Sequence, residues 1–148
     1  ALVAELTAIN PAGRPVSYPL IPLYDGRRIY FTSAVLFSKK FEHIKANPKV
    51  SVSLSDPAAM TGVPLGRACI QGDATVLDTE DPHSAWERLL PMWTAKEPAI
   101  AKLVKQRFGL PLFFERHIIE VAPTREFFWP GGDTAAAPRV LTCLAAER

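Results

Sequence analysis

The distribution of proline restricts the fold of this chain more than any other sequence feature. The chain contains 14 prolines against 8 glycines, and the prolines are scattered rather than gathered in one linker. Proline breaks the interior of a helix, and within a sheet it is confined to edges, strand starts and bulges. Long helices are therefore excluded, and we expect short elements whose ends the prolines mark.

The size and composition are those of one ordinary globular domain, which we expect to span residues 1–148. The chain has 148 residues, of which 48% are hydrophobic and 22% charged. Its net charge of +2 is too small to indicate a nucleic-acid or membrane-surface partner, and no apolar run is long enough to span a membrane. Two cysteines are too few for a disulfide framework, and the first seven residues lack the basic segment of a secretory signal. We therefore expect a cytoplasmic protein.

Most of the chain is predicted to be β-structure. Strands are indicated by apolar, β-branched or alternating segments at residues 2–9, 15–24, 28–33, 50–54, 67–77, 113–121 and 124–129. Asp25-Gly26 is typical of a tight hairpin turn. Gly72 interrupts one strand and indicates a bulge or a close approach of two backbones.

Helical spacing of apolar residues appears in two places. Residues 38–46 predict a short amphipathic helix with Ser38 as its N-cap. The clearer helical pattern lies at about residues 82–108 and predicts a helical insertion that Pro98 divides in two. Helices do not alternate with strands as they do in a doubly wound parallel sheet. The order favours a mainly β (α+β) fold, a small antiparallel barrel with short peripheral helices.

Standard catalytic and metal-binding signatures are absent from the sequence. His43, His83 and His117 lack metal-ligand spacing with one another or with either cysteine. There is no nucleophile elbow, phosphate-binding P-loop or dinucleotide-binding glycine motif. We therefore predict no metal site, and no catalytic residue can be named from the sequence.

One segment carries the residue types of a phosphate site. A predicted strand ends in Thr32 and Ser33, and the next helix begins with Ser38, Lys39 and Lys40. Hydroxyls, ammonium groups and the N–H groups of a helix start all bind phosphate. Lysines are unfavourable near the positive end of a helix unless an anion lies beside them. The alternative is that the two lysines are an ordinary solvated surface pair.

The same segment resembles the phosphate-binding run of the pyridoxamine 5′-phosphate oxidase-like flavoproteins, the split-barrel flavin-binding family. The matching residues are Phe31-Thr32, Ser38-Lys39-Lys40, Ile44, Asn47-Pro48 and Val50–Val52, with Pro19–Leu23 and Asp25-Gly26 before them and Val121–Trp129 after. The resemblance covers roughly residues 1–77 and 117–130 and implies an antiparallel split β-barrel. It also implies a flavin-dependent oxidoreductase, in which the ring of the cofactor performs the hydride chemistry.

The resemblance assigns roles to individual residues. The phosphate of the cofactor is expected at Thr32, Ser33, Ser38, Lys39 and Lys40. The flavin ring is expected along the strand formed by Pro19, Leu20, Ile21 and Pro22. Trp129 matches an aromatic residue that approaches the cofactor from the partner subunit of a homodimer. The cofactor is expected to be FMN or, alternatively, the 8-hydroxy-5-deazaflavin coenzyme that actinobacteria and methanogens use. A composition rich in Ala, Arg and Pro is typical of a GC-rich genome and favours the deazaflavin alternative.

The sequence also departs from the true oxidase. The oxidase carries a C-terminal R-L-H-D-R segment that binds pyridoxal, whereas residues 131–139 read G-G-D-T-A-A-A-P-R and end in Arg139. We therefore expect a small organic substrate other than pyridoxamine phosphate. Trp86, Met92 and Trp93 in the insertion either line the substrate pocket or pack in the core.

Two features leave alternatives open. Three consecutive aromatic residues, 127–129, force at least one ring away from its own core, where either a second subunit or the barrel's own end covers it. The lack of a visible acid or base also fits a non-catalytic protein that binds a flavin or a tetrapyrrole. A third possibility is a purely structural barrel without a cofactor.

Overall fold

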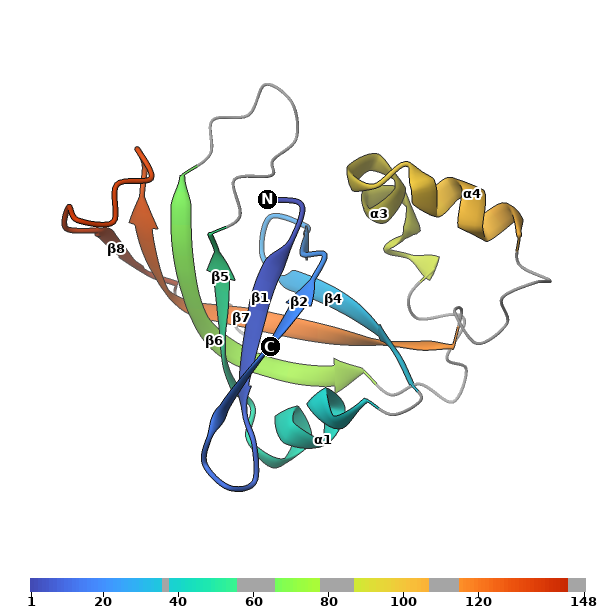
Figure 1. The fold of residues 1–148 in the computed structure, drawn as a ribbon, viewed down its shortest axis with the longest axis horizontal. Helices are drawn as coiled ribbons and strands as arrows, with labels where there is room; N and C mark the ends of the chain where they lie inside the picture. The colour runs from blue at the N-terminus through green and yellow to red at the C-terminus, as the bar shows by residue number, and fades with distance from the viewer. Residues whose placement is uncertain (36–37, 56–65, 78–86, 107–114, 144–148) are drawn as a thin grey trace.

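The computed structural model describes residues 1–35, 38–55, 66–77, 87–106 and 115–143. The elements in these ranges are β1 (Ala4–Ile9), β2 (Pro15–Leu20), β3 (Leu23–Tyr24), β4 (Ile29–Ala34), α1 (Lys39–Ala46), β5 (Lys49–Leu54), β6 (Arg67–Leu77), α3 (Leu90–Lys96), α4 (Ala99–Lys105), β7 (Arg116–Trp129) and β8 (Arg139–Thr142). Figure 1 shows a curled sheet with α1 at one end and the α3–α4 pair beside β4.

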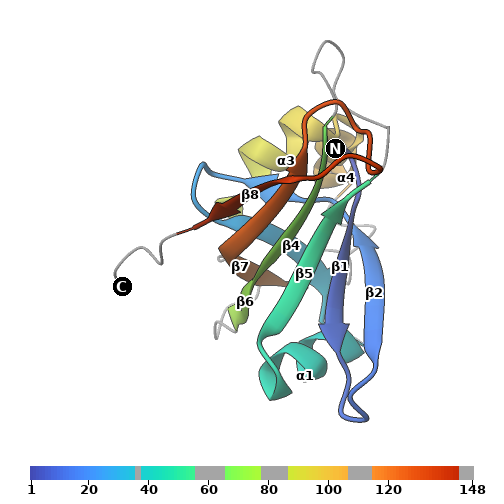
Figure 2. The same ribbon diagram turned by 90° about the vertical axis from the view of Figure 1, so that its left-hand side faces the viewer.

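All strand pairings are antiparallel, in the order β2-β1-β5-β6-β7-β4-β3, and β8 adds to β7. The long strands β6 and β7 bend across the molecule and carry the sheet around into a half-closed barrel (Figures 1 and 2). The predicted split β-barrel with short peripheral helices is therefore confirmed. The barrel interior is filled by alternate residues of its strands together with Phe41 and Ile44 of α1.

Strand β4 is buried on both faces, and this arrangement positions the candidate site. Phe31 lies in the barrel interior, whereas Tyr30 packs in a second apolar cluster with Trp93 and Ile100 of the helical insertion. Because successive side chains of a strand point to opposite faces, β4 separates the barrel core from the core under α3 and α4. Met92 also packs in the second core, whereas Trp86 lies outside the described residues.

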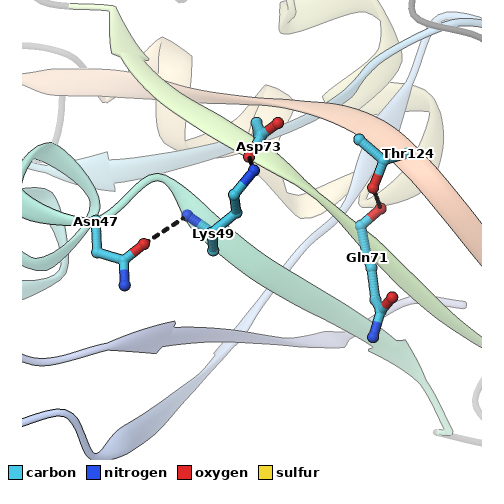
Figure 3. Close-up of polar contacts among 5 residues, drawn as sticks. All are labelled: Asn47, Lys49, Gln71, Asp73 and Thr124. Carbon is cyan, nitrogen blue, oxygen red and sulfur yellow. Dashed lines mark hydrogen bonds and ion pairs between the residues drawn. The ribbon is translucent and has the colours of Figure 1, made fainter.

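A proline inside β7 is accommodated by a bulge. Gln71 of β6 pairs with Arg125 and the next residue, Gly72, pairs with Pro123, so Thr124 has no register partner on β6. The Thr124 hydroxyl donates to the Gln71 carbonyl at 3.2 Å (Figure 3). Proline is tolerated at such a bulge because the ladder is already interrupted there.

Gly72 meets both expectations stated for it. It lies at the register shift, and a Cβ atom built on it would come within 2.4 Å of the Ala122 carbonyl oxygen.

The adjoining β5–β6 ladder carries an exposed ion pair between Lys49 and Asp73 at 2.6 Å (Figure 3). The Lys49 backbone N–H donates to the Asn47 side-chain oxygen just before the strand (Figure 3).

The structure corrects several predicted boundaries. Residues 113–121 and 124–129 were expected as two strands, but β7 runs unbroken from Arg116 to Trp129 because the bulge absorbs the proline. Strand β8 was not predicted. The insertion forms α3 and α4, and the part of it at 82–86 and 107–108 lies outside the described residues. In the described parts of the chain, no helix is long and apolar enough to cross a membrane.

Candidate functional site

The Lys40 ammonium group is the centre of a first polar cluster. Lys40 Nζ donates to Ser33 Oγ at 2.9 Å and to Ser38 Oγ at 3.2 Å, and the two hydroxyl oxygens are 3.5 Å apart. Ser38 occupies the N-cap position of α1, but its side chain makes no capping hydrogen bond. Ser38 therefore occupies the predicted N-cap position, but its hydroxyl accepts a hydrogen bond from the Lys40 ammonium group instead of from a backbone N–H of the helix.

Aromatic side chains surround the same ammonium group. Lys40 Nζ lies 5.2 Å from the Tyr18 ring centroid and 6.0 Å from that of Phe41. The Tyr18 hydroxyl is in turn 3.0 Å from His43 Nδ1. Within the described residues Lys40 contacts hydroxyls and rings but no carboxylate, so its positive charge is not neutralised by these neighbours.

A second cation lies close to the first. Arg116, at the start of β7, donates from Nε to Thr32 Oγ1 at 3.0 Å and from Nη2 to the Thr32 carbonyl at 3.2 Å. Its guanidinium carbon lies 5.1 Å from the Trp93 ring centroid. Burial lowers the pKa of Arg116 to about 10. Burial also lowers the pKa of Lys40, and the nearby charge of Arg116 lowers it further.

The two cations approach β4 from opposite faces. Ser33, bonded to Lys40, faces the barrel interior, whereas Thr32, bonded to Arg116, faces the helical insertion. Both strand residues are buried, with 8% of Thr32 and 7% of Ser33 exposed. The phosphate-type residues predicted from one short segment therefore form two neighbouring groups rather than one.

A pocket of about 240 Å³ opens on the Thr32 side. Its lining residues are Val3, Pro19, Leu20, Ile21, Thr32, Trp93 and Arg116. Three of the four residues expected along the flavin ring thus share one cavity with Thr32. Trp93 is buried in the second core, as one of the two alternatives for it stated, and it also lines this pocket.

The remaining predicted residues lie elsewhere. Pro22 is buried beside the pocket, and its carbonyl accepts a hydrogen bond from Lys96 of α3. Lys39 is exposed to solvent. Trp129 lies at the opposite end of β7 from Arg116, roughly 40 Å along the strand, and its indole N–H donates to the Ala136 carbonyl of its own chain at 2.9 Å.

Arg116 was missed in the sequence because no local pattern marks it. It is a single basic residue at the start of an apolar strand, 84 residues from Thr32. The one sequence feature that could have indicated a role for Arg116 is its positive charge at the start of a strand that soon becomes apolar. Tyr18 was missed for the same reason, since its contact with Lys40 spans two separate elements.

The residues present fit a phosphate-bearing planar cofactor. Ammonium, guanidinium and hydroxyl groups are the usual ligands of phosphate. The largely apolar pocket next to them suits a flat ring system. Among the described residues, no group of three or more His, Cys, Asp or Glu side chains is arranged to hold a metal ion.

Solved structures share this fold at low sequence identity. An F420 reductase is 23% identical with a TM-score of 0.58, over 84% of this chain and 88% of the other. A putative pyridoxamine 5′-phosphate oxidase from Listeria innocua is 19% identical with a TM-score of 0.58, over 86% and 88%. The heme storage protein of Vibrio cholerae is 13% identical with a TM-score of 0.58, over 82% and 81%. A search of curated proteins finds no match.

The family model described as pyridoxamine 5′-phosphate oxidase matches residues 3–130, which include β1–β7 and both polar clusters. This match extends over most of the chain, and the split barrel agrees with it. The chain therefore belongs to the pyridoxamine 5′-phosphate oxidase family.

Proposed function

We propose that this protein is an oxidoreductase that uses FMN or, alternatively, the 8-hydroxy-5-deazaflavin coenzyme, and acts on a small organic substrate other than pyridoxamine phosphate. The observation that carries the proposal is the apolar pocket of Pro19, Leu20 and Ile21, which is also lined by Thr32 and Arg116 and lies across β4 from Lys40. When bound, the ring of the cofactor supplies hydride transfer.

The chain itself binds and orients the cofactor. Lys40, Ser33 and Ser38 hold the phosphate through charge-assisted and hydroxyl hydrogen bonds at the end of β4, where Thr32 and Arg116 lie on the pocket side of the strand. The backbone of β2 and the segment that follows it flank the ring. Lys96 fixes that segment by its hydrogen bond to the Pro22 carbonyl. The buried Trp93 forms part of the pocket wall.

A homodimer is part of the proposal. The pocket of about 240 Å³ in one chain is smaller than the roughly 300–1,000 Å³ of ordinary ligand sites, so we propose that a second subunit completes its wall. Val140 and Leu141 of β8 are 46% and 55% exposed beside the aromatic end of β7. Apolar side chains at this end suit an interface that brings Trp129 toward the partner's cofactor.

A tetrapyrrole-binding function is the second candidate, supported by the fold shared with a heme storage protein. Heme iron needs an axial ligand such as His, Cys, Met or Tyr, and none of these is among the described residues that line the pocket. Of the described histidines, His43 contacts Tyr18 and His117 packs against Phe41. These contacts favour the flavin over the tetrapyrrole.

The test is the absorption spectrum and mass of whatever co-purifies with the protein. FMN absorbs at about 450 nm and the deazaflavin at about 420 nm, whereas heme gives an intense Soret band. Protein that purifies colourless is then titrated with FMN, with the deazaflavin coenzyme and with hemin. Tight binding of hemin with no binding of either flavin would refute the proposal. Sedimentation of the loaded protein at the mass of one chain would refute the homodimer.

A further inference from the structure

A tyrosine of β2 lies against the first turns of α1 and contacts two of its side chains. The Lys40 ammonium nitrogen lies 5.2 Å from the centroid of the Tyr18 ring. The Tyr18 hydroxyl is 3.0 Å from Nδ1 of His43, and the two rings are tilted by 41°. Residues three apart in a helix are neighbours on its surface. One tyrosine therefore meets both helix residues, with its ring beside Lys40 and its hydroxyl beside His43.

Lys40 also lies at the opening of the barrel. In the described sheet β2 is the strand at one end, and at the other end β3 pairs only with Ile29 and Tyr30 of β4. The Lys40 ammonium group contacts one side chain from each end, Tyr18 of β2 and Ser33 of β4. It therefore lies between the two edges that the described sheet leaves open.

The pocket is lined from the same two strands. Pro19 follows Tyr18 directly in β2, and Thr32 precedes Ser33 directly in β4. Both Pro19 and Thr32 line the pocket. A ligand in the pocket is therefore one residue away, along each strand, from the residues that contact Lys40.

The aromatic contact holds the ammonium group without neutralising it. A lysine side chain loses conformational entropy when it is ordered, and this loss opposes binding unless the side chain is already held in place. The Ser33 and Ser38 hydroxyls accept hydrogen bonds from Lys40 at 2.9 and 3.2 Å. The Tyr18 ring attracts the cation through its π face and carries no charge. The ammonium group is thus fixed in place and keeps its positive charge for an anion.

We infer that Tyr18 and His43 are positioning residues of the phosphate site. The Tyr18 ring holds the Lys40 ammonium group where the phosphate binds, and His43 fixes the ring through the Tyr18 hydroxyl. Neither residue has to contact the phosphate itself. The inference rests on the proposed function, in which Lys40, Ser33 and Ser38 hold the phosphate of the cofactor.

FMN and riboflavin test the role of Tyr18, because they share the ring system and differ by the phosphate. Tyr18→Leu should raise the Kd for FMN about 3- to 10-fold, the cost of ordering one long side chain, and leave the Kd for riboflavin unchanged. Tyr18→Phe keeps the ring and should cause a smaller rise. The control is Tyr24→Leu, at a tyrosine that is 61% exposed. A Tyr18→Leu protein that keeps its affinity for FMN, or loses affinity for both ligands equally, would overturn the inference.

A double-mutant cycle tests the role of His43. Tyr18→Phe and His43→Ala each remove one partner of the same contact. If His43 acts through Tyr18, the double variant should raise the Kd for FMN no more than either single variant does. Additive effects would show that His43 acts on the phosphate independently, and its positioning role would be wrong. Circular dichroism checks that each variant is folded.

The unloaded wild-type protein provides a test that depends on neither a variant nor a flavin. NMR order parameters of lysine side chains report their mobility. Lys40 should be more ordered than the exposed Lys39, and Tyr18→Leu should reduce its order to that of Lys39. Equal mobility of the two lysines in the wild-type protein would overturn the inference. Failure of the wild-type protein to bind FMN or the deazaflavin would refute the proposed function instead, and the order of Lys40 would still decide whether Tyr18 holds it.

Discussion

Replacing Lys40 by methionine separates a role in binding from a role in stability. Methionine keeps the length of the side chain and removes the ammonium group. In the structure Ser33 and Ser38 take two of the three donors of this group, which leaves one N–H for a phosphate oxygen. One charge-assisted hydrogen bond contributes about 1.5–3 kcal/mol. Lys40→Met should therefore raise the Kd for FMN by about 10- to 150-fold.

The unloaded protein should respond in the opposite sense. Burial, followed by the charge of Arg116, lowers the pKa of Lys40, so the folded state disfavours the charged form relative to the unfolded state. At neutral pH the ammonium group therefore costs stability, and this cost disappears as the pH rises through the lowered pKa toward 10.5, the ordinary pKa of a lysine. Lys40→Met should leave the melting temperature of the unloaded protein unchanged or raise it.

The assay is fluorescence quenching of FMN during titration, with thermal melting followed by circular dichroism. Lys39→Met tests the exposed neighbour, for which the structure predicts a change in Kd of less than about threefold. Lys102→Met on α4 is the neutral control. A Lys40→Met protein that binds FMN as tightly as wild type would refute the phosphate assignment. A large loss of stability would show that Lys40 is structural instead.

Two further predictions concern the fold. Gly72→Ala should destabilise the protein by about 1–3 kcal/mol, because its new Cβ would lie 2.4 Å from the Ala122 carbonyl oxygen. Gly131→Ala is the control, since its Cβ would meet nothing within 4 Å. Equal urea midpoints for the two variants would contradict the close approach of the two backbones at the bulge. Burial, and then the Asp25 carboxylate, raise the pKa of Tyr30 to about 12. Its contribution to stability is therefore present below about pH 10 and lost as the pH rises toward 12, so Tyr30→Phe should flatten that part of the stability curve measured by urea titration.

Local sequence patterns were sufficient for much of the fold. The strand over 67–77 was predicted with the boundaries that β6 has, because its alternation matches a strand with one buried face. Its glycine was correctly associated with a bulge. Helix α1 and the hairpin turn at Asp25-Gly26 also follow from nearby residues. Turn chemistry and side-chain period act over a few residues, so one sequence is enough to read them.

Other features depended on partners that are distant in the chain. Pro123 divided the predicted last strand in two, whereas the pairing with Gly72 places it at a bulge inside one strand. Strand β8 has four exposed residues and no alternation, and it exists because β7 offers an edge to pair with. Pairing across a sheet decides such elements, and a local pattern does not record it.

The candidate site divides along the same line. The sequence by itself determined that Thr32, Ser33, Ser38 and Lys40 lie close together, because they share one strand end and one helix start. Only the tertiary structure decided that Thr32 and Ser33 serve opposite faces of β4, and that Arg116 bonds to Thr32 from 84 residues away. The physical reason is that strand alternation fixes which face a residue occupies, whereas the neighbours it meets there are chosen by the closing of the barrel and the packing of the helical insertion.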